Sequence, residues 1–233
     1  AVGASALSAN TTGASNVAIG RQALAANTEG GSNAAVGTNA LTANTTGSSN
    51  NAFGSTALDN NTTGSSNTAI GNDALDANTT ASDNVAVGNG AMFANTTGCQ
   101  NTAIGRRALN TNITGDNNVA VGFCALKLNT ADNNTAVGHD ALKANTTGAN
   151  NTALGYGAMY EGTTTGDFNT MVGVSSGRKM TSGASNSALG VNAMESNTTG
   201  ANNTGMGMSA LAANTTAANN TAVGVSALTA NTT

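Results

Sequence analysis

The sequence predicts an all-β protein, a parallel β-solenoid (a β-roll or β-helix) of about fourteen 17-residue coils. Three observations predict it. The stretch NTAVGHDALKANTTGANN (134–151) returns with variations every 17 residues, every unit carries a Gly at its fourth position, and every full unit ends in Asn. A short fixed period indicates units that stack on their neighbours instead of folding alone. Long helical units are excluded by the density of Gly and Asn.

The repeat gives thirteen full or nearly full units and a final partial one. Only two lengths deviate: the unit that begins at Val119 is one residue short, and the unit that begins at Thr152 is one residue long. We therefore expect a single solenoid domain over residues 1–233, open at both ends, with irregular coils at 156–185. The unit starts are Ala1, Val17, Ala34, Asn51, Thr68, Val85, Thr102, Val119, Thr135, Thr152, Thr170, Ser187, Thr204 and Thr221.

The first four positions of each unit predict a short strand and a corner. The fourth position never accepts a side chain, as at Gly71, Gly105 and Gly138, which indicates a positive φ or a very close neighbour. The third position is aliphatic and shares its parity with a first position that is mainly Thr or Val. This alternation predicts a strand with one face turned inward, so that each coil buries its Ile or Val.

A second apolar position follows four residues after the Gly, usually Leu preceded by Ala. This segment is too short to distinguish a strand from a single helical turn. The predicted core of each coil is thin, about 4 to 7 kcal/mol of burial, against an ordering cost of about 1 to 2 kcal/mol per residue. We therefore expect the Ala and Leu columns to pack against other copies of the chain.

The remainder of each unit predicts a turn and a ladder. The NTTG stretch is typical of turns because Asn tolerates left-handed conformations and Gly supplies positive φ. The Asn that ends each unit, as at Asn67, Asn101 and Asn134, stands at the same place in every coil. Amides placed in this way can bond to those above and below, so we interpret this column as structural.

The composition argues against several functional classes. Charged residues are 8% and the formal net charge is -4, mixed along the chain, so we expect no nucleic-acid partner, and no apolar run is long enough for membrane insertion. Cys99 and Cys124 fall at different places in the repeat and are not expected to pair. We expect no enzyme and no cofactor, and we interpret the single histidine, His139, as a solvated loop residue.

Two modest alternatives remain open for bound groups. Acidic residues such as Asp83, Asp116, Asp132 and Asp167 precede the last Asn of a unit, and they make Ca²⁺ a weak alternative because calcium needs six to eight oxygens. Sequons of the form N-x-[ST] line one column and are candidate glycosylation sites. They are Asn10, Asn44, Asn61, Asn78, Asn95, Asn112, Asn145, Asn197, Asn214 and Asn231.

The irregular stretch from Tyr156 to Ser185 loosens the repeat and holds both tyrosines. Exposed aromatic and Arg side chains on a regular scaffold are typical of contact sites. A drifted repeat without a role is the competing interpretation. The candidate surface contacts are Tyr156, Tyr160, Phe168, Arg178 and Lys179.

The stretches NVAIG (16–20), NVAVG (84–88, 118–122) and NTAIG (67–71, 101–105), each followed by xxAL, resemble the head repeats of trimeric autotransporter adhesins. The longer form NTAIGxxALxANTTGxxN also resembles repeat tracts of phage tail fibres. The resemblance implies a left-handed parallel β-roll, a homotrimer, and a role in reaching and gripping a surface. The unit here is 17 residues instead of about 14, and no neck or coiled-coil stalk is visible.

These features together predict a structural segment of an extracellular fibre on a virion or cell surface. Such a segment would act as a spacer and attachment element, with itself as partner and a cell-surface receptor or glycan as target. One alternative is a filament that assembles end to end from its own copies. The other is a solenoid that binds ice or glycan, the ice-binding version resting on the nearly unbroken Thr row that follows the turn Asn, from Thr11 to Thr232.

Overall fold

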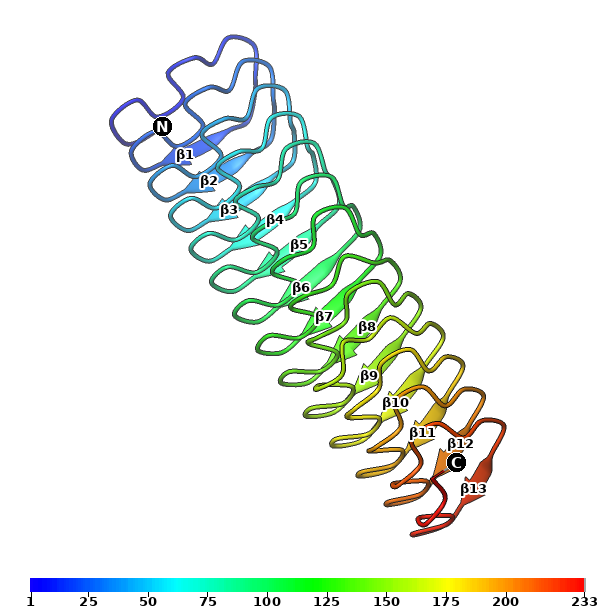
Figure 1. Cartoon of the computed structure of the whole chain (residues 1–233). Coiled ribbons are helices and arrows are strands. Elements are labelled where there is room, and N and C mark those ends of the chain that lie inside the picture. The colour runs from blue at the N-terminus through cyan, green and yellow to red at the C-terminus, as the bar shows by residue number, and fades with distance from the viewer. Residues whose placement is uncertain (233) are drawn as a thin grey trace. The chain divides into compact units, whose positions relative to one another are not determined.

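The computed structural model describes residues 1–232 and contains no α-helix among them. The chain divides into two compact units, Ala1–Asn117 and Asn118–Thr233. In each unit, three-residue strands pair in parallel and in register with the strands of the coils before and after. The prediction of a parallel β-solenoid is thereby confirmed (Figure 1).

The first unit has six strands, and an isolated parallel bridge joins Val2 to Ile19 ahead of them. They are β1 (Val17–Ile19), β2 (Ala34–Val36), β3 (Asn51–Phe53), β4 (Thr68–Ile70), β5 (Val85–Val87) and β6 (Thr102–Ile104). The second unit has seven strands, β7 (Val119–Val121), β8 (Thr135–Val137), β9 (Thr152–Leu154), β10 (Thr170–Val172), β11 (Ser187–Leu189), β12 (Thr204–Met206) and β13 (Thr221–Val223). Each of the thirteen begins at a predicted unit start.

The orientation predicted for these strands is wrong. The middle residue is the buried one, as with Ala18 and Ala69, while the third residue points outward and leaves Ile19 45% and Ile70 43% exposed. The core of each coil is therefore made by the two Ala columns and the Leu column, exemplified by Leu75 at 0% exposure. The prediction that these columns pack against other copies is also wrong, because they fill the coil itself.

The glycine that follows each strand is required by the stacking of the coils. Gly20 has φ +133°, and a Cβ placed on it would lie 2.3 Å from the carbonyl oxygen of Gly37 in the next coil. Gly71 and Gly138 have the same conformation, with the nearest backbone atom 2.7 Å and 2.4 Å from such a Cβ, and Gly105 has φ 134°. Any side chain here would collide with backbone, which explains the unvarying column.

The segment after this glycine is neither a strand nor a helical turn. Alternate residues have left-handed φ, 60° at Gln22 and 52° at Leu24, and the backbone N–H groups alternate in their partners. Ala23 donates within its coil to Gly20 (3.4 Å), whereas Leu24 donates to Ala40 of the next coil (3.0 Å). A left-handed residue costs about 1–2 kcal/mol, which the complete burial of Leu24 and its hydrogen bond offset.

Two asparagine ladders run through the coils, where one was predicted. In the predicted column, Asn33 accepts at Oδ1 from the backbone N–H of Asn50 (2.9 Å) and donates from Nδ2 to Gly47 O (2.8 Å). Asn67, Asn101 and Asn134 occupy the same role. The second ladder joins the asparagines of the NTTG turns directly, as where Asn61 Nδ2 donates to Asn44 Oδ1 (2.8 Å).

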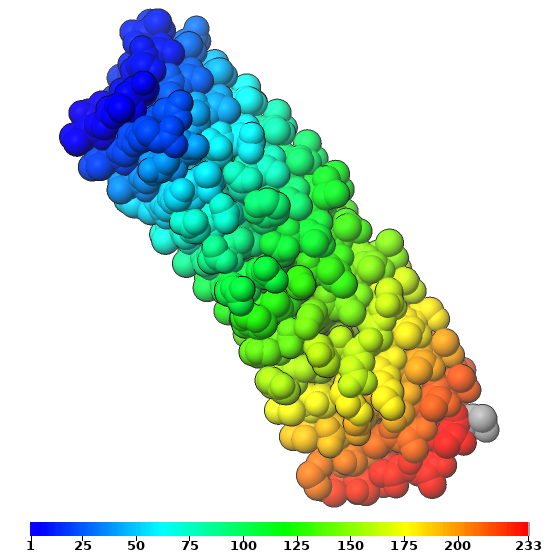
Figure 2. Space-filling view, turned by 60° about the vertical axis from the view of Figure 1, so that its left-hand side comes forward, coloured from blue at the N-terminus to red at the C-terminus, as the bar shows by residue number. Residues whose placement is uncertain are grey.

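The turn glycine does not have the conformation predicted for it. Gly47 and Gly64 carry no positive φ, and Ala81 stands in the same column. The left-handed residue of this turn is instead the one before the last Asn, as at Ser49 (φ 60°) and Ser66 (φ 60°). Within each unit, successive coils pack directly against one another (Figure 2).

Candidate functional surfaces

The outward side of the strands, here called the strand face, consists of the first and third residues of each strand. None of the thirteen strands contains a charged residue. The third residues are large and apolar, and each is partly or fully exposed, as with Phe53 (41%), Ile104 (41%) and Leu189 (50%). Monomeric soluble proteins rarely leave contiguous apolar surface of this kind uncovered, so this face is a candidate contact surface.

The strand face of the second unit also carries a shallow hollow of about 220 Å³. Its lining is almost entirely apolar and comes from three successive strands, with Val172, Leu189 and Met206 as the large side chains. Small residues make the room, because Ser187 and Ala188 stand between these larger neighbours. The hollow has the dimensions to receive an apolar side chain from a partner.

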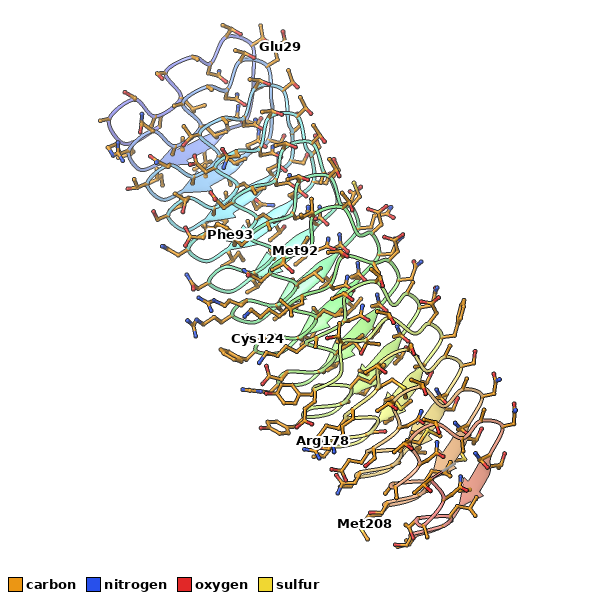
Figure 3. The ribbon with its side chains drawn as sticks, in the orientation of Figure 1. Glu29, Met92, Phe93, Cys124, Arg178 and Met208 are labelled. Carbon is orange, nitrogen blue, oxygen red and sulfur yellow. The ribbon has the colours of Figure 1, made fainter. Side chains whose placement is uncertain are left out.

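A second surface, here called the turn face, is formed by the residues one to six positions after each strand glycine. All seven basic residues of the chain lie on it. Figure 3 shows the alternation of this segment at Met92, which points into the coil, and Phe93, which projects from it. Glu29 lies at a different edge of the same unit (Figure 3). The basic side chains are therefore separated from the strand face.

Three rings are stacked on the turn face of the second unit. The centroids of Phe123 and His139 lie 4.9 Å apart at 24°, and those of His139 and Tyr156 lie 5.4 Å apart at 29°. His139 is thus held between two aromatic rings, and its Nδ1 lies 3.1 Å from Asp140 Oδ2. The rings cover each other's faces, so the stack mainly stabilises successive coils.

Lys143 connects this stack to the second tyrosine. Its ammonium lies 3.2 Å from Asp140 Oδ1 and 5.1 Å from the centroid of the Tyr160 ring. Partial burial lowers the pKa of Lys143, but the hydrogen bond to Asp140 and the negative charge of that carboxylate outweigh it, so the pKa is raised overall. The lysine therefore stays charged at neutral pH.

Arg178 forms a charge ladder across three coils. Its guanidinium contacts Glu161 Oε1 (2.9 Å) in the preceding coil and Glu195 Oε1 (2.5 Å) in the following one. Lys179 donates its backbone N–H to Glu195 O (3.0 Å). Because both carboxylates are engaged by Arg178, this ladder ties the irregular coils together.

Of the five predicted surface contacts, the structure brings Tyr156, Tyr160 and Arg178 onto the turn face of the second unit, and Lys179 lies next to Arg178. Phe168 is 62% exposed but stands in the turn before Asn169, away from this segment of its coil.

Sequence reasoning missed Phe123 and Lys143 as members of the turn-face cluster. The signal was present in the spacing. Phe123, His139 and Tyr156 all directly follow a strand glycine, and parallel coils in register superimpose such positions.

The irregular stretch also interrupts the second asparagine ladder. The coil that begins at Thr152 has no asparagine in its turn, and the next coil has the buried Met180 there. Asn145 Oδ1 is consequently buried without a hydrogen-bond partner, and Asn197 Nδ2, which donates to Gly200 O (2.9 Å), meets the sulfur of Met180 (3.5 Å) in place of an asparagine oxygen. The side-chain ladder is therefore interrupted at these coils.

The sequons lie on the second ladder, which bears on their glycosylation. The side chains of eight are completely buried, and their Nδ2 atoms donate to neighbouring acceptors, as at Asn78, which donates to Asn61 Oδ1 (2.8 Å) and Ala81 O (3.1 Å). A glycan on such a nitrogen would have to open the ladder, so the folded coils argue against modification there. The eight are Asn44, Asn61, Asn78, Asn95, Asn112, Asn145, Asn197 and Asn214. Asn10 and Asn231 are partly exposed.

The threonine row on which the ice-binding alternative rested is also engaged within the fold. Thr28 Oγ1 donates to Thr45 O (3.1 Å), and Thr45 Oγ1 donates to Thr62 O (3.0 Å). These hydroxyls therefore donate to the backbone of the next coil, at positions that range from part-buried to exposed. A row whose donors are already used is less suited to ice binding than a free hydroxyl array.

Acidic side chains in the turns cap neighbouring backbone. Asp116 Oδ1 accepts from the N–H of Cys99 (2.7 Å), and Asp167 Oδ1 accepts from that of Ala149 (2.7 Å). Within residues 1–232, no three His, Cys, Asp or Glu side chains converge as a metal site would need. Cys99 and Cys124 are both unpaired thiols, as predicted. No helix in the described chain is long and apolar enough to cross a membrane.

The strand face and the turn face thus belong to a parallel β-solenoid with 17-residue coils. Comparison with known proteins yields no matching family model, no matching curated protein and no matching solved structure. The geometry of the two faces is accordingly the basis for a functional proposal.

Proposed function

We propose that this chain is a structural segment of an extracellular fibre, a spacer and attachment element of a virion tail fibre or a cell-surface appendage, in which copies associate side by side as a homotrimer. The observation that carries this proposal is the strand face, because a column of exposed aliphatic residues without charges is suited to contact with other copies. The resemblance of the NTAIG and NVAVG stretches to adhesin heads favours three chains.

The size of the strand face supports stable association. With one or two half-exposed side chains on each of six or seven strands, a unit presents roughly 500–700 Å² of charge-free surface, approaching the ~800 Å² per partner of a standard interface. Burying Ile70, Ile104 and their equivalents removes apolar area from water, which is the dominant favourable contribution to protein association. Charged residues on the turn face keep the outside of such an assembly soluble.

The coils suit a spacer because their spacing is set by short-range contacts that repeat. Each coil is bonded to the next through the strand backbone, through both asparagine ladders and through the turn backbone, as where Thr45 N–H donates to Thr62 O (2.9 Å). Stability in such arrays depends on the contact of each repeat with its neighbours, so length can grow by adding coils.

Sedimentation equilibrium of the purified chain tests the proposal. We expect a mass of three chains that is independent of concentration, and dissociation when Ile70 and Ile104 are both replaced by Lys. Replacing Asn72 and Asn89 by Lys adds the same charge on the exposed turn face of the same coils and should leave the trimer intact. A monomeric wild-type chain would contradict the proposal, as would a double Ile→Lys variant that keeps its mass. A mass that grows continuously with concentration would indicate the end-to-end filament instead.

A further inference from the structure

The turn face of the first unit carries a notch that lies apart from the strand face proposed to join copies. It is centred on Gly90, which stands two residues after a strand glycine, in a column that otherwise holds polar side chains in this unit. A Cβ built on Gly90 would make only ordinary van der Waals contacts, with Asn110 Nδ2 at 3.5 Å and Arg107 Cγ at 3.8 Å, so a side chain could be accommodated there. The notch has a volume of about 280 Å³ and is lined by Asp73, Asn89, Gly90, Phe93, Arg107 and Asn110.

The charges of the notch lie on opposite sides of the gap. Asp73 and Arg107 occupy the same column as Gly90 in the coils before and after it, about 10 Å apart along the stack at the usual strand spacing. Asp73 Oδ1 already accepts from Thr56 Oγ1 (2.6 Å), which fixes the carboxylate. The structure gives Arg107 no ion pair, so its guanidinium is available to a bound anion.

The remaining walls supply an apolar surface and amide groups. The side chain of Phe93 is 42% exposed and projects outward beside the gap (Figure 3). Asn110 Nδ2 donates to Gly90 O (2.8 Å), which leaves its Oδ1 as an acceptor, and the exposed Asn89 lines the opening, with its Nδ2 donating to Asn72 O (3.3 Å). An aromatic ring beside a carboxylate, amides and a guanidinium can hold a ligand that has an apolar face, several hydroxyls and one negative charge.

The second unit repeats this glycine in a different charge environment. The sequence GYGAMY (155–160) parallels GNGAMF (88–93), and a Cβ on Gly157 would also make only ordinary van der Waals contacts, with Ser175 Oγ and Tyr160 Cβ at 3.8 Å. Here Asp140 is paired with Lys143 and His139, and Arg178 is paired with two glutamates. Ser175 stands where the first unit has Arg107, so this position serves as an internal comparison.

We propose that the notch around Gly90 binds a carbohydrate that carries a carboxylate. In this arrangement, Arg107 donates two hydrogen bonds to the carboxylate, Asp73 and the amides of Asn89 and Asn110 bond the hydroxyls, and the apolar face of the sugar ring packs on Phe93. A free amino acid such as phenylalanine has no ring hydroxyls for Asn89 and Asn110 to bond. The inference rests on the proposed function in one respect, since it supplies the attachment element with its ligand.

Saturation-transfer NMR with glucuronate as the probe tests this site on the full chain, with glucose and phenylalanine as comparison ligands. We expect glucuronate to bind, and glucose to bind about tenfold more weakly because it lacks the charged partner of Arg107. The Gly90→Asn variant fills the notch in a left-handed conformation (φ +63°) that Asn tolerates better than most residues and that Asn39 already adopts in the same column at φ 59°. It should reduce glucuronate binding at least about tenfold, as should Arg107→Gln.

The Gly157→Asn variant is the matched control and should bind glucuronate as the wild type does. The proposal is overturned if wild type gives no transfer to glucuronate, if Gly90→Asn binds it undiminished, or if phenylalanine binds more tightly than glucuronate. The same samples give the oligomeric mass independently. A monomer that binds glucuronate would overturn only the proposed assembly, and a trimer that does not bind it would overturn only this site.

Discussion

Replacing Asn61 by Ala tests whether the buried amide ladder stabilises the coils. Asn61 is completely buried, and its Nδ2 donates to Asn44 Oδ1 (2.8 Å) and Gly64 O (2.9 Å). Its Oδ1 accepts from Asn78 Nδ2 (2.8 Å). Truncation removes these three hydrogen bonds and fully deprives Asn44 Oδ1 of a side-chain donor.

The expected loss follows from the groups left without partners. A buried polar group without a hydrogen bond costs about 1–3 kcal/mol. Asn44 Oδ1 loses its donor, whereas Gly64 O keeps its hydrogen bond from Asn50 Nδ2 (2.8 Å) and Asn78 Nδ2 keeps its bond to Ala81 O (3.1 Å). With one buried acceptor unsatisfied and a small cavity, we expect a destabilisation of about 2–4 kcal/mol.

Urea unfolding followed by far-UV circular dichroism measures the loss, and amide hydrogen exchange locates it in the coils on either side of Asn61. Asn72→Ala makes the same chemical change at an exposed position of the turn face and should cost less than about 0.5 kcal/mol. Equal midpoints for the two variants would refute the assignment of the ladder as a stabilising element.

Three further substitutions test other parts of the fold. Gly37→Ala places a Cβ 2.2 Å from the next coil at φ +145°, so it should disturb stacking and lower the free energy of unfolding by about 3 kcal/mol or more. Gly90→Asn should leave the melting temperature nearly unchanged. Equal melting temperatures for the two variants would contradict this expectation. Asp76→Asn should raise the melting temperature at pH 7, because burial, together with Asp59 and Asp73, raises the pKa of Asp76 above its ordinary 3.8. A carboxyl with a raised folded-state pKa contributes stability below pH 3.8 that is lost as pH rises through the folded-state value. The difference in melting temperature between Asp76→Asn and the wild type should therefore vanish in acid. A difference that is constant with pH would contradict the raised pKa. Met171→Ala should lower the free energy of unfolding in urea by about 2–5 kcal/mol, because this buried side chain fills the space left where Gly177 replaces the usual Leu. Met206→Ala truncates the exposed methionine of β12 and is the control; an equal loss in the two variants would contradict this packing.

The coils, their starting positions and the glycine corner could be predicted because each depends on a local backbone requirement that repeats. Gly20 and its equivalents have no room for a side chain, so the column is visible in one sequence. The ladder at Asn67 was predictable for the same reason, since an amide that bonds the next coil must recur in every coil.

Which side of each strand is buried could not be predicted from alternation alone. Alternation shows that the first and third residues share one side of the strand, but not whether that side points inward. The better indicator is variation in size. A packed core does not accommodate Val36, Phe53 and Met206 at one position, whereas the nearly constant Ala18 column is what a thin core requires. The left-handed Leu24 was not predictable either, because intrinsic preference argues against it and only the stacked coils stabilise it.

The turn-face contacts depended on the pairing of particular coils. Tyr156 stacks on His139 because parallel registration places one directly above the other, which the repeat alignment implies. The partners of Arg178 required the three-dimensional structure, since Glu161 and Glu195 stand at slightly different positions in their own coils.

The most direct measurement of the central claim is the distance between copies across the strand face. In a chain with Cys99 and Cys124 replaced by Ser, a nitroxide spin label is attached to a single Cys at position 70, and in a second chain at position 72. Pulsed electron–electron double resonance should give a well-defined and short distance between labels at 70 and a longer one at 72, because Ile70 lies on the strand face and Asn72 on the turn face. No dipolar coupling at position 70, or a shorter distance from position 72, would contradict association through the strands.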